Sequence, residues 1–177
     1  MIPIQGSLLD SDCDYICHQV NCQGRMNSGV AKAIRDKWPV VYNEYMKHYV
    51  HTYDMFAGIV NERHASIPTA KELLGQVQIV PINEKQNVVN LFSQENYGYD
   101  GKRYTSYDAF YDALVRLRDT TPANSSYAFP YRIGSDRGGA NWWIIRTMIE
   151  EVFYGRRVYI YYLGEVPENE KRNCKMD

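Results

Sequence analysis

The sequence predicts an α/β domain with three layers, α/β/α, built on a central mixed, mostly parallel sheet. Short apolar runs alternate along the chain with longer segments whose apolar residues recur every three or four positions. The apolar runs are nearly continuous, which is typical of strands that helices cover on both faces. The 177 residues, of which 45% are hydrophobic, suffice for one domain with a sizeable core.

Six apolar runs are expected to form the sheet. They are a first strand near Ile2–Gln5, then Tyr15–Val20, Val77–Ile82, Val88–Phe92, Tyr127–Ile133 and Val158–Leu163. Each is short, and Gly, Pro or polar residues interrupt the sequence between them, as strand boundaries require. The segment Val50–Leu74 has no strong period, and only its end near Lys71–Leu74 suggests a short helix.

Four segments have helical periodicity. The apolar positions are Val30, Ile34 and Trp38; Val41, Tyr45 and Tyr49 after Pro39; Tyr107, Phe110, Tyr111, Leu114 and Leu117; and Ile145, Met148, Ile149, Val152 and Phe153. Pro39 suits a first helical turn. Ser106 or Thr105 is expected to cap the third helix and Asn141 the fourth, with Gly155 just beyond the fourth.

Bulk properties restrict the class of partner. A net charge of −1 argues against general nucleic-acid or membrane-surface binding, and no apolar run approaches the roughly 18 residues that span a bilayer. Nothing after Met1 has the pattern of a signal peptide, so we expect a cytoplasmic protein with reduced thiols at Cys13, Cys17, Cys22 and Cys174. The charged segment 166–177 is expected to be a poorly ordered tail after a domain at 1–165.

Two glycine-rich loops each follow a predicted strand and precede a predicted helix. They are Gly24–Gly29 and Gly134–Gly139, called loop one and loop two below. Glycine lets the backbone approach a ligand, and free N–H groups at a helix start attract phosphate. Loop one alone is equally consistent with a tight turn that binds nothing. Neither loop has the P-loop or G-x-G-x-x-G pattern, but two such loops at strand ends favour a diphosphate lying between them.

These segments resemble the macrodomain family, in its compact bacterial and phage form (the Appr-1-p processing type). The resemblance rests on Ile16-Cys17-His18-Gln19-Val20-Asn21, on Gly24 and the run Ser28–Ile34, and on the loop from Ile133-Gly134 through Gly139 to Trp142. Asn90–Gln94 and Tyr104–Tyr107 resemble the middle of the same family, so about residues 1–163 are covered. The resemblance implies a mixed sheet flanked by helices, with ADP-ribose in a surface cleft.

The resemblance also implies the binding residues. Asn21 would hydrogen-bond the distal ribose, loop one would line that ribose and the phosphates, loop two would wrap the diphosphate, and the adenine would lie near Ser7 and Leu8. The set is Ser7, Leu8, Asn21, Gly24, Met26, Ser28, Gly29, Val30, Ile133, Gly134, Ser135, Asp136, Arg137, Gly138 and Gly139. Many macrodomains have Asp where this chain has Ser7, so its preference for adenine is open.

Catalysis and simple binding both remain open from the sequence. Macrodomain hydrolases that use a lysine nucleophile carry it where this chain has Ser93–Asn96, and their loop-two aspartate corresponds here to Gly138, so a covalent lysine mechanism is not expected. His18 and Asp136, with Asn21 to position the ribose, are the candidates for hydrolysis. The alternative for His18 is a hydrogen-bonded core histidine. Arg137 could pair with a phosphate, whereas Asp136 would repel one unless it acts as an acid or base or points away.

The functions to weigh are therefore an ADP-ribose-1″-phosphate phosphatase or ADP-ribosyl hydrolase, a non-catalytic ADP-ribose-binding module, and a binder of another nucleotide. Expected partners are ADP-ribose or a derivative and ADP-ribosylated macromolecules. No cofactor is expected. No metal is expected either, because Cys13, Cys17, His18 and Cys22 lack a C-x-x-C spacing and strand alternation separates neighbours. Cys22 has no paired base in sight that would activate its thiol.

Overall fold

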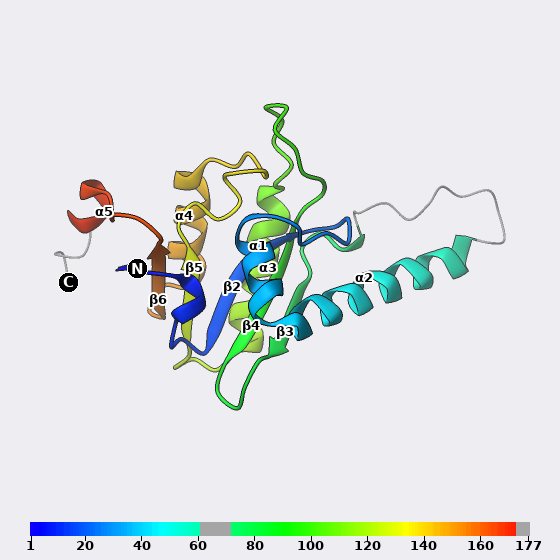
Figure 1. The fold of residues 1–177 in the computed structure, drawn as a ribbon, viewed down its shortest axis with the longest axis horizontal. Coiled ribbons are helices and arrows are strands. Elements are labelled where there is room, and N and C mark those ends of the chain that lie inside the picture. Colours follow the sequence, from blue (N-terminus) through cyan, green and yellow to red (C-terminus); the bar gives the residue numbers. More distant parts are fainter. Residues whose placement is uncertain (61–71, 173–177) are drawn as a thin grey trace.

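The computed structural model describes residues 1–60 and 72–172 of the chain. Its strands are β1 (Ile2–Gln5), β2 (Tyr15–Asn21), β3 (Val77–Pro81), β4 (Asn87–Gln94), β5 (Ser126–Pro130) and β6 (Arg157–Tyr162). Its helices are the short 3₁₀ turn η1 (Leu8–Asp10), α1 (Gly29–Lys37), α2 (Pro39–Val60), α3 (Tyr107–Thr120), α4 (Trp142–Val152) and α5 (Glu168–Arg172) (Figure 1). All six predicted strands and all four predicted helices are present.

The strands form one sheet in the order β1-β6-β5-β2-β4-β3. Every neighbouring pair is parallel except β3 with β4, which is antiparallel. The predicted mixed, mostly parallel sheet is therefore confirmed. β2 lies in the middle of the sheet, between β4 and β5, and the candidate site residues after it therefore follow a central strand.

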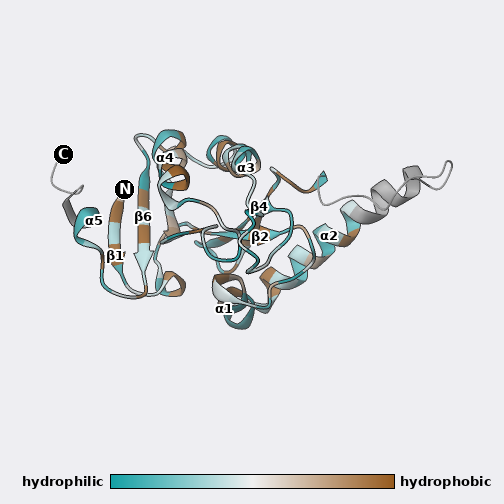
Figure 2. Cartoon of the chain, turned by 90° about the horizontal axis from the view of Figure 1, so that it is seen from above, coloured by the Kyte–Doolittle hydropathy of each residue, from teal (hydrophilic) through white to brown (hydrophobic). Residues whose placement is uncertain are grey.

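Helices cover both faces of the sheet, which confirms the three layers. Figure 2 shows α3 and α4 along one face and α1 along the other. The first face buries one apolar core around Leu91, Phe110, Leu114, Phe129 and Ile145. The second buries another core, in which Ile16 and Val20 of β2 meet α1 and α2. Because side chains alternate along a strand, Cys17 of the same strand belongs to the first core.

Local signals set most helix boundaries as predicted. Ser106 Oγ accepts from the Ala109 amide at 3.2 Å and Asn141 Oδ1 from the Trp143 amide at 2.9 Å, so both caps are confirmed. Pro39 begins α2, which continues through part of the segment without periodicity to Val60. β5 stops at Pro130 rather than at Ile133, because the chain turns through Arg132 at φ 58°. Lys71 and Cys174, on which earlier expectations fell, lie outside the described residues.

The segment expected to be a poorly ordered tail contains the helix α5. Its Glu170 side chain is buried against α4, where Trp142 Nε1 donates to Glu170 Oε1 at 3.3 Å. Arg146 Nη1 lies 3.4 Å from the other carboxylate oxygen. The start of this segment is therefore packed against α4. Glu170 forms a buried ion pair with Arg146 and accepts a hydrogen bond from the Trp142 indole. Within the described ranges, none of the helices combines the length and the hydrophobicity needed to cross a membrane.

Candidate functional site: a cavity between the two glycine loops

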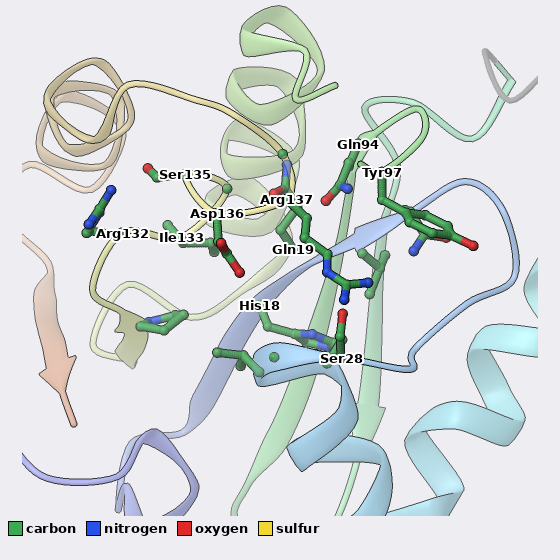
Figure 3. A pocket seen from close by; sticks show the side chains of 18 of the residues that line it. His18, Gln19, Ser28, Gln94, Tyr97, Arg132, Ile133, Ser135, Asp136 and Arg137 are labelled. Atoms are coloured by element: carbon green, nitrogen blue, oxygen red, sulfur yellow. The ribbon is translucent and has the colours of Figure 1, made fainter. Parts of the chain in front are cut away.

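The sheet topology creates a crevice between β2 and β5. The two strands are parallel neighbours, yet β2 leads into α1 on one face of the sheet and β5 leads into α4 on the other. The loops after them must part at the carboxyl ends of the strands, which is where open α/β sheets bind ligands. A cavity of about 720 Å³ lies there (Figure 3). This volume is in the range that holds a nucleotide-sized molecule.

Most of the predicted site residues line this one cavity. They are His18, Asn21, Ser28, Gly29, Val30, Ile133, Gly134, Ser135, Asp136, Arg137 and Gly138. Figure 3 shows His18 rising from β2 on one side, and Asp136 and Arg137 extending from loop two on the other. The two loops chosen from their glycines thus meet at a common site.

Five other predicted residues are not part of the cavity wall. They are Ser7, Leu8, Gly24, Met26 and Gly139. Ser7 caps η1, with its Oγ accepting from the Leu9 amide at 3.2 Å, and Leu8 is buried in the core beneath α1. Met26 is fully buried in that same core. The structure therefore uses these side chains to hold the fold rather than to face the cavity.

The remaining two are glycines, the buried Gly24 and the exposed Gly139, at which an added Cβ would meet other parts of the chain. A Cβ on Gly24 would lie 3.3 Å from the Tyr49 ring of α2. A Cβ on Gly139 would lie 2.7 Å from the carbonyl oxygen of Lys102. Both are tight packing positions that anchor the ends of the loops, so their requirement for glycine has a packing cause and not a ligand.

Loop one leaves the start of α1 without a cap. Ser28 occupies the N-cap position, but its side chain makes no capping hydrogen bond and instead lines the cavity. Gly29, at φ 56°, Val30 and Ala31 follow along the cavity wall. First-turn amides have no acceptor inside a helix, and they carry its positive dipole end. The cavity therefore has a ready site for an anion at this wall.

Asn21 orders loop one from the end of β2. Its Nδ2 donates to the Arg25 carbonyl at 2.7 Å, and its Oδ1 accepts from the Gln23 amide at 2.9 Å and from the Arg25 amide at 3.3 Å. The Tyr45 hydroxyl donates to the Asn21 backbone carbonyl at 2.7 Å. Among the described residues, the second N–H of the Asn21 side-chain amide has no partner, so it can donate to a ligand hydroxyl.

Loop two supplies backbone donors. The amides of Asp136, Arg137 and Gly138 have no hydrogen-bond partner among the described residues. Gly138 is closely packed, because a Cβ there would lie 2.5 Å from the Gly134 carbonyl oxygen. Thr105 Oγ1 donates to that same carbonyl at 3.0 Å. Loop two is therefore a backbone cradle that is held in place by these contacts, and its unpartnered N–H groups are the kind of donor that binds anions.

Residues that sequence reasoning missed hold this cradle in place. Gln19 Nε2 donates to Thr105 Oγ1 at 3.1 Å and to Ser93 Oγ at 3.0 Å. Gln19 and Gln94 also line the cavity. The available signal was a glutamine near the carboxyl end of each of two buried strands. Thr105 carried no signal, since its role depends on a contact 29 residues away.

Three arginines, Arg25, Arg132 and Arg137, and the carboxylate residue Asp136 are among the described residues that line the cavity. Figure 3 shows the Arg137 side chain extending into the cavity, whereas that of Arg132 extends away from Asp136 and Arg137. Arg137 is oriented by Tyr99, whose hydroxyl accepts from its Nε at 2.8 Å. Tyr97, from the same loop as Tyr99, is also in the wall. This balance favours an anionic ligand with more than one charge.

His18 is neutral in this structure. Burial lowers its pKa from 6.5 to about 4, although the hydrogen bond to Asn90 works in the opposite direction. It is a buried, hydrogen-bonded histidine, and it also lines the cavity, so both expectations for it have a basis. A neutral imidazole with this pKa is a poor proton donor near neutral pH.

The three described cysteines are buried free thiols. Burial raises the pKa of each, and that of Cys22 reaches about 12, so Cys22 is not a thiolate nucleophile. In the part of the chain that the structure covers, no three His, Cys, Asp or Glu side chains gather as metal ligands would.

Comparison with known proteins places the fold. No family model matches the chain. A Bacteroides thetaiotaomicron protein of unknown function has 25% identity and a TM-score of 0.71, covering 90% of this chain and 96% of that one. A Streptomyces coelicolor macrodomain protein has 22% identity and a TM-score of 0.69, with 92% and 99% covered. The chain has the macrodomain fold, as the resemblance implied.

Two further relatives carry names that describe a ligand or reaction. Thermosipho africanus DarTG, solved in complex with ADP-ribose, has 15% identity and a TM-score of 0.67, covering 96% of this chain and 44% of that one. An Aspergillus oryzae ADP-ribose 1″-phosphate phosphatase is 44% identical over 46 residues. That match spans 25% of this chain and only 23% of the phosphatase.

Proposed function

We propose that this macrodomain-fold chain binds ADP-ribose or a close derivative in the cavity between loops one and two. The observation that carries the proposal is that two segments with unpartnered amides line one cavity: the uncapped start of α1 at Ser28, and loop two, where the amides of Asp136 to Gly138 have no partner among the described residues. Two such sites in one cavity suit the two phosphates of a diphosphate. The ADP-ribose complex of DarTG, which shares the fold, supports the choice of ligand.

The side chains assign the parts of the ligand. Arg137 reaches a phosphate oxygen, and the spare N–H of Asn21 donates to a ribose hydroxyl. Ser7 and Leu8 lie outside the cavity wall, so the adenine contacts expected of them pass to other residues. Selection between adenine and another base is therefore a property to measure, and GDP is the comparison ligand.

Isothermal titration calorimetry tests the binding. One molecule of ADP-ribose should bind per chain. Arg137→Gln should lower the affinity for ADP-ribose, whereas Arg116→Gln, on the exposed side of α3, should not change it. GDP should compete poorly. If GDP bound as well as ADP-ribose, a different nucleotide would be the ligand. If neither bound, the cavity would have another purpose.

Hydrolysis of the bound derivative is the second candidate function, and Asp136 is the residue that favours it. Its exposed carboxylate lines the cavity beside the free amides, where it would repel a phosphate unless it has a chemical task. Such a carboxylate can activate a water that attacks a phosphomonoester or an ADP-ribosyl ester. The short match to an ADP-ribose 1″-phosphate phosphatase supports the same class. ADP-ribosylated macromolecules are the larger substrates of this class.

One assay distinguishes an enzyme from a non-catalytic binding module. Release of phosphate from ADP-ribose-1″-phosphate, or of ADP-ribose from an ADP-ribosylated protein, should stop in Asp136→Asn while ADP-ribose affinity is kept. Asp119→Asn, at the far end of α3, is the matched control and should turn over normally. Absence of turnover in the unaltered protein, with tight binding, would make the chain a binding module.

A further inference from the structure

A chain of amide side chains, from the buried Asn90 to the half-buried Gln78, connects His18 to the backbone of α2. His18 Nε2 lies 2.6 Å from Asn90 Oδ1, and Asn90 Nδ2 lies 2.9 Å from Gln78 Oε1. Gln78 Nε2 in turn lies 2.9 Å from the carbonyl oxygen of Glu44. The three side chains project from adjacent strands at paired positions, with His18 opposite Asn90 and Asn90 opposite Gln78.

The last link fixes the direction of every bond in the chain. A backbone carbonyl can only accept, so Gln78 must present its NH₂ group to Glu44 and its oxygen to Asn90. Asn90 must then direct its NH₂ group at Gln78 and its oxygen at His18. An amide oxygen also only accepts, so the proton of the neutral imidazole must be on Nε2.

This arrangement leaves Nδ1 of His18 as a lone pair. Nδ1 is buried and has no hydrogen-bond partner in the described structure. His18 is itself part of the cavity wall. Buried polar atoms are almost always paired, so a donor from outside the chain is expected at Nδ1. A lone pair attracts a hydroxyl and repels a phosphate oxygen.

We propose that Gln78 and Asn90 are positioning residues that hold His18 as a fixed acceptor, and that His18 Nδ1 accepts a hydrogen bond from a ribose hydroxyl of the ligand. The inference rests on the proposed binding of an ADP-ribose compound. It orients that ligand, because sugar lies against His18 while phosphate lies against the start of α1 and loop two. It also replaces the role of proton donor for His18 with that of acceptor.

The chain contains a matched control for this relay. His48 Nε2 lies 2.7 Å from Gln76 Oε1, and Gln76 Nε2 donates to the Glu72 carbonyl at 2.6 Å. The same logic places a proton on Nε2 of His48, but His48 is not part of the cavity wall. The His48 resonances are therefore an internal control, because a ligand in the cavity does not contact this side chain.

Nitrogen NMR of protein labelled with ¹⁵N-histidine, at neutral pH, tests the proposal. Without ligand, both His18 and His48 should show a protonated Nε2, and His18 Nδ1 should be unprotonated. Saturation with ADP-ribose should move the His18 Nδ1 resonance toward the protonated range and leave His48 in place. A protonated Nδ1 in the free protein would overturn the relay.

Two outcomes with ligand separate the inference from the function on which it rests. If calorimetry shows ADP-ribose binding while His18 Nδ1 does not move, the acceptor role is wrong and the proposed function stands. If ADP-ribose does not bind, the proposed function and the acceptor role fail together, and the spectrum of the free protein still decides the tautomer.

Variants of the relay supply the second test. Gln78→Met removes both links and should give a mixture of His18 tautomers with about fivefold weaker ADP-ribose binding. Gln78→Glu keeps the acceptor for Asn90 but loses the donor to the Glu44 carbonyl, so it tests the Asn90 link alone and should retain the Nε2–H form. Gln76→Met should alter His48 alone. Equal affinity in Gln78→Met and the unaltered protein, with both folded by circular dichroism, would contradict the positioning role.

Discussion

The guanidinium of Arg137 lies over the ring of Tyr99, 4.8 Å from its centre, and its Nε donates to the Tyr99 hydroxyl at 2.8 Å. The contact joins loop two to the loop that follows β4, so an exposed tyrosine holds the cationic side chain that faces the cavity. A flexible arginine is thereby ordered before any anion arrives, which lowers the entropy lost on binding.

Loss of the Arg137 charge should lower the affinity for an anionic ligand about tenfold. The affinity of Arg137→Gln for ADP-ribose should also depend less on salt, because one screened attraction is gone. Tyr99→Phe should keep the ring contact and lose only the hydrogen bond, so its effect should be smaller. Calorimetry at low and high salt measures both. An unchanged salt dependence in Arg137→Gln would place this side chain away from the ligand.

Two serines at helix starts should respond in opposite ways to the same change. Ser106→Ala removes a formed cap from α3 and should lower the free energy of unfolding by about 1 kcal/mol. Ser28→Ala removes no capping bond from α1 and should leave stability nearly unchanged. Denaturant unfolding gives the first comparison and ADP-ribose titration the second, where only Ser28→Ala should weaken binding. A large stability loss in Ser28→Ala would mean that its hydroxyl does cap the helix.

Gly138→Ala should damage the site more than the fold. The added methyl group would meet the Gly134 carbonyl and the Thr105 hydroxyl, so loop two must shift. We expect a loss of ADP-ribose affinity of at least tenfold. Gly164→Ala, where nothing lies within 4 Å of the added carbon, is the control and should bind normally. Normal binding by Gly138→Ala would show that the position of loop two does not matter to the ligand.

The depressed pKa of His18 predicts a pH dependence of stability. Its pKa is about 4 in the folded protein and near 6.5 in the unfolded chain, so the unfolded chain binds more protons between these values. The contribution of His18 to the free energy of unfolding is therefore fully present above pH 6.5. It is lost as the pH drops toward 4, and the loss reaches up to about 3 kcal/mol. His18→Gln should lose less stability over that window in urea titrations. Parallel curves for both proteins would assign the dependence to other groups.

Glu170→Ala should destabilise the domain from the C-terminal side. The change leaves the half of Arg146 that faced Glu170, and the Trp142 indole N–H, without their buried acceptor. Breaking one partner of a buried pair costs about 3 kcal/mol. Thermal unfolding measures it, with Glu165→Ala, at an exposed position before α5, as the control. An unchanged melting temperature would mean that the segment after 165 contributes nothing to the fold.

Much of this structure followed from local pattern. Nearly continuous apolar runs and three- to four-residue periods gave every strand and helix of the core, and Ser106 and Asn141 marked two helix starts. The order of strands did not follow, because pairing between β2 and β5 joins residues about 110 positions apart. The crevice between those strands, and with it the exact wall of the cavity, depends on that pairing.

The site residues divide along the same line. Glycines flag backbone that comes close to something, and the two loops they marked do line the cavity. Glycine does not say what comes close, however, and at Gly24 and Gly139 it is the protein itself. Met26 lies in a polar loop but turns into the core, while Gln19 lies in an apolar strand and supports the cradle. Both depend on tertiary contacts that a local pattern does not contain.

A calorimetric titration of the full chain with ADP-ribose, repeated on Gly138→Ala and Gly164→Ala, tests most directly whether a ligand lies between the two glycine loops. ADP-ribose should occupy one site per chain in the unaltered protein and the same site in Gly164→Ala, and it should bind at least tenfold more weakly to Gly138→Ala. Absence of binding to the unaltered protein, or equal affinity in all three, would contradict a ligand held between the two glycine loops.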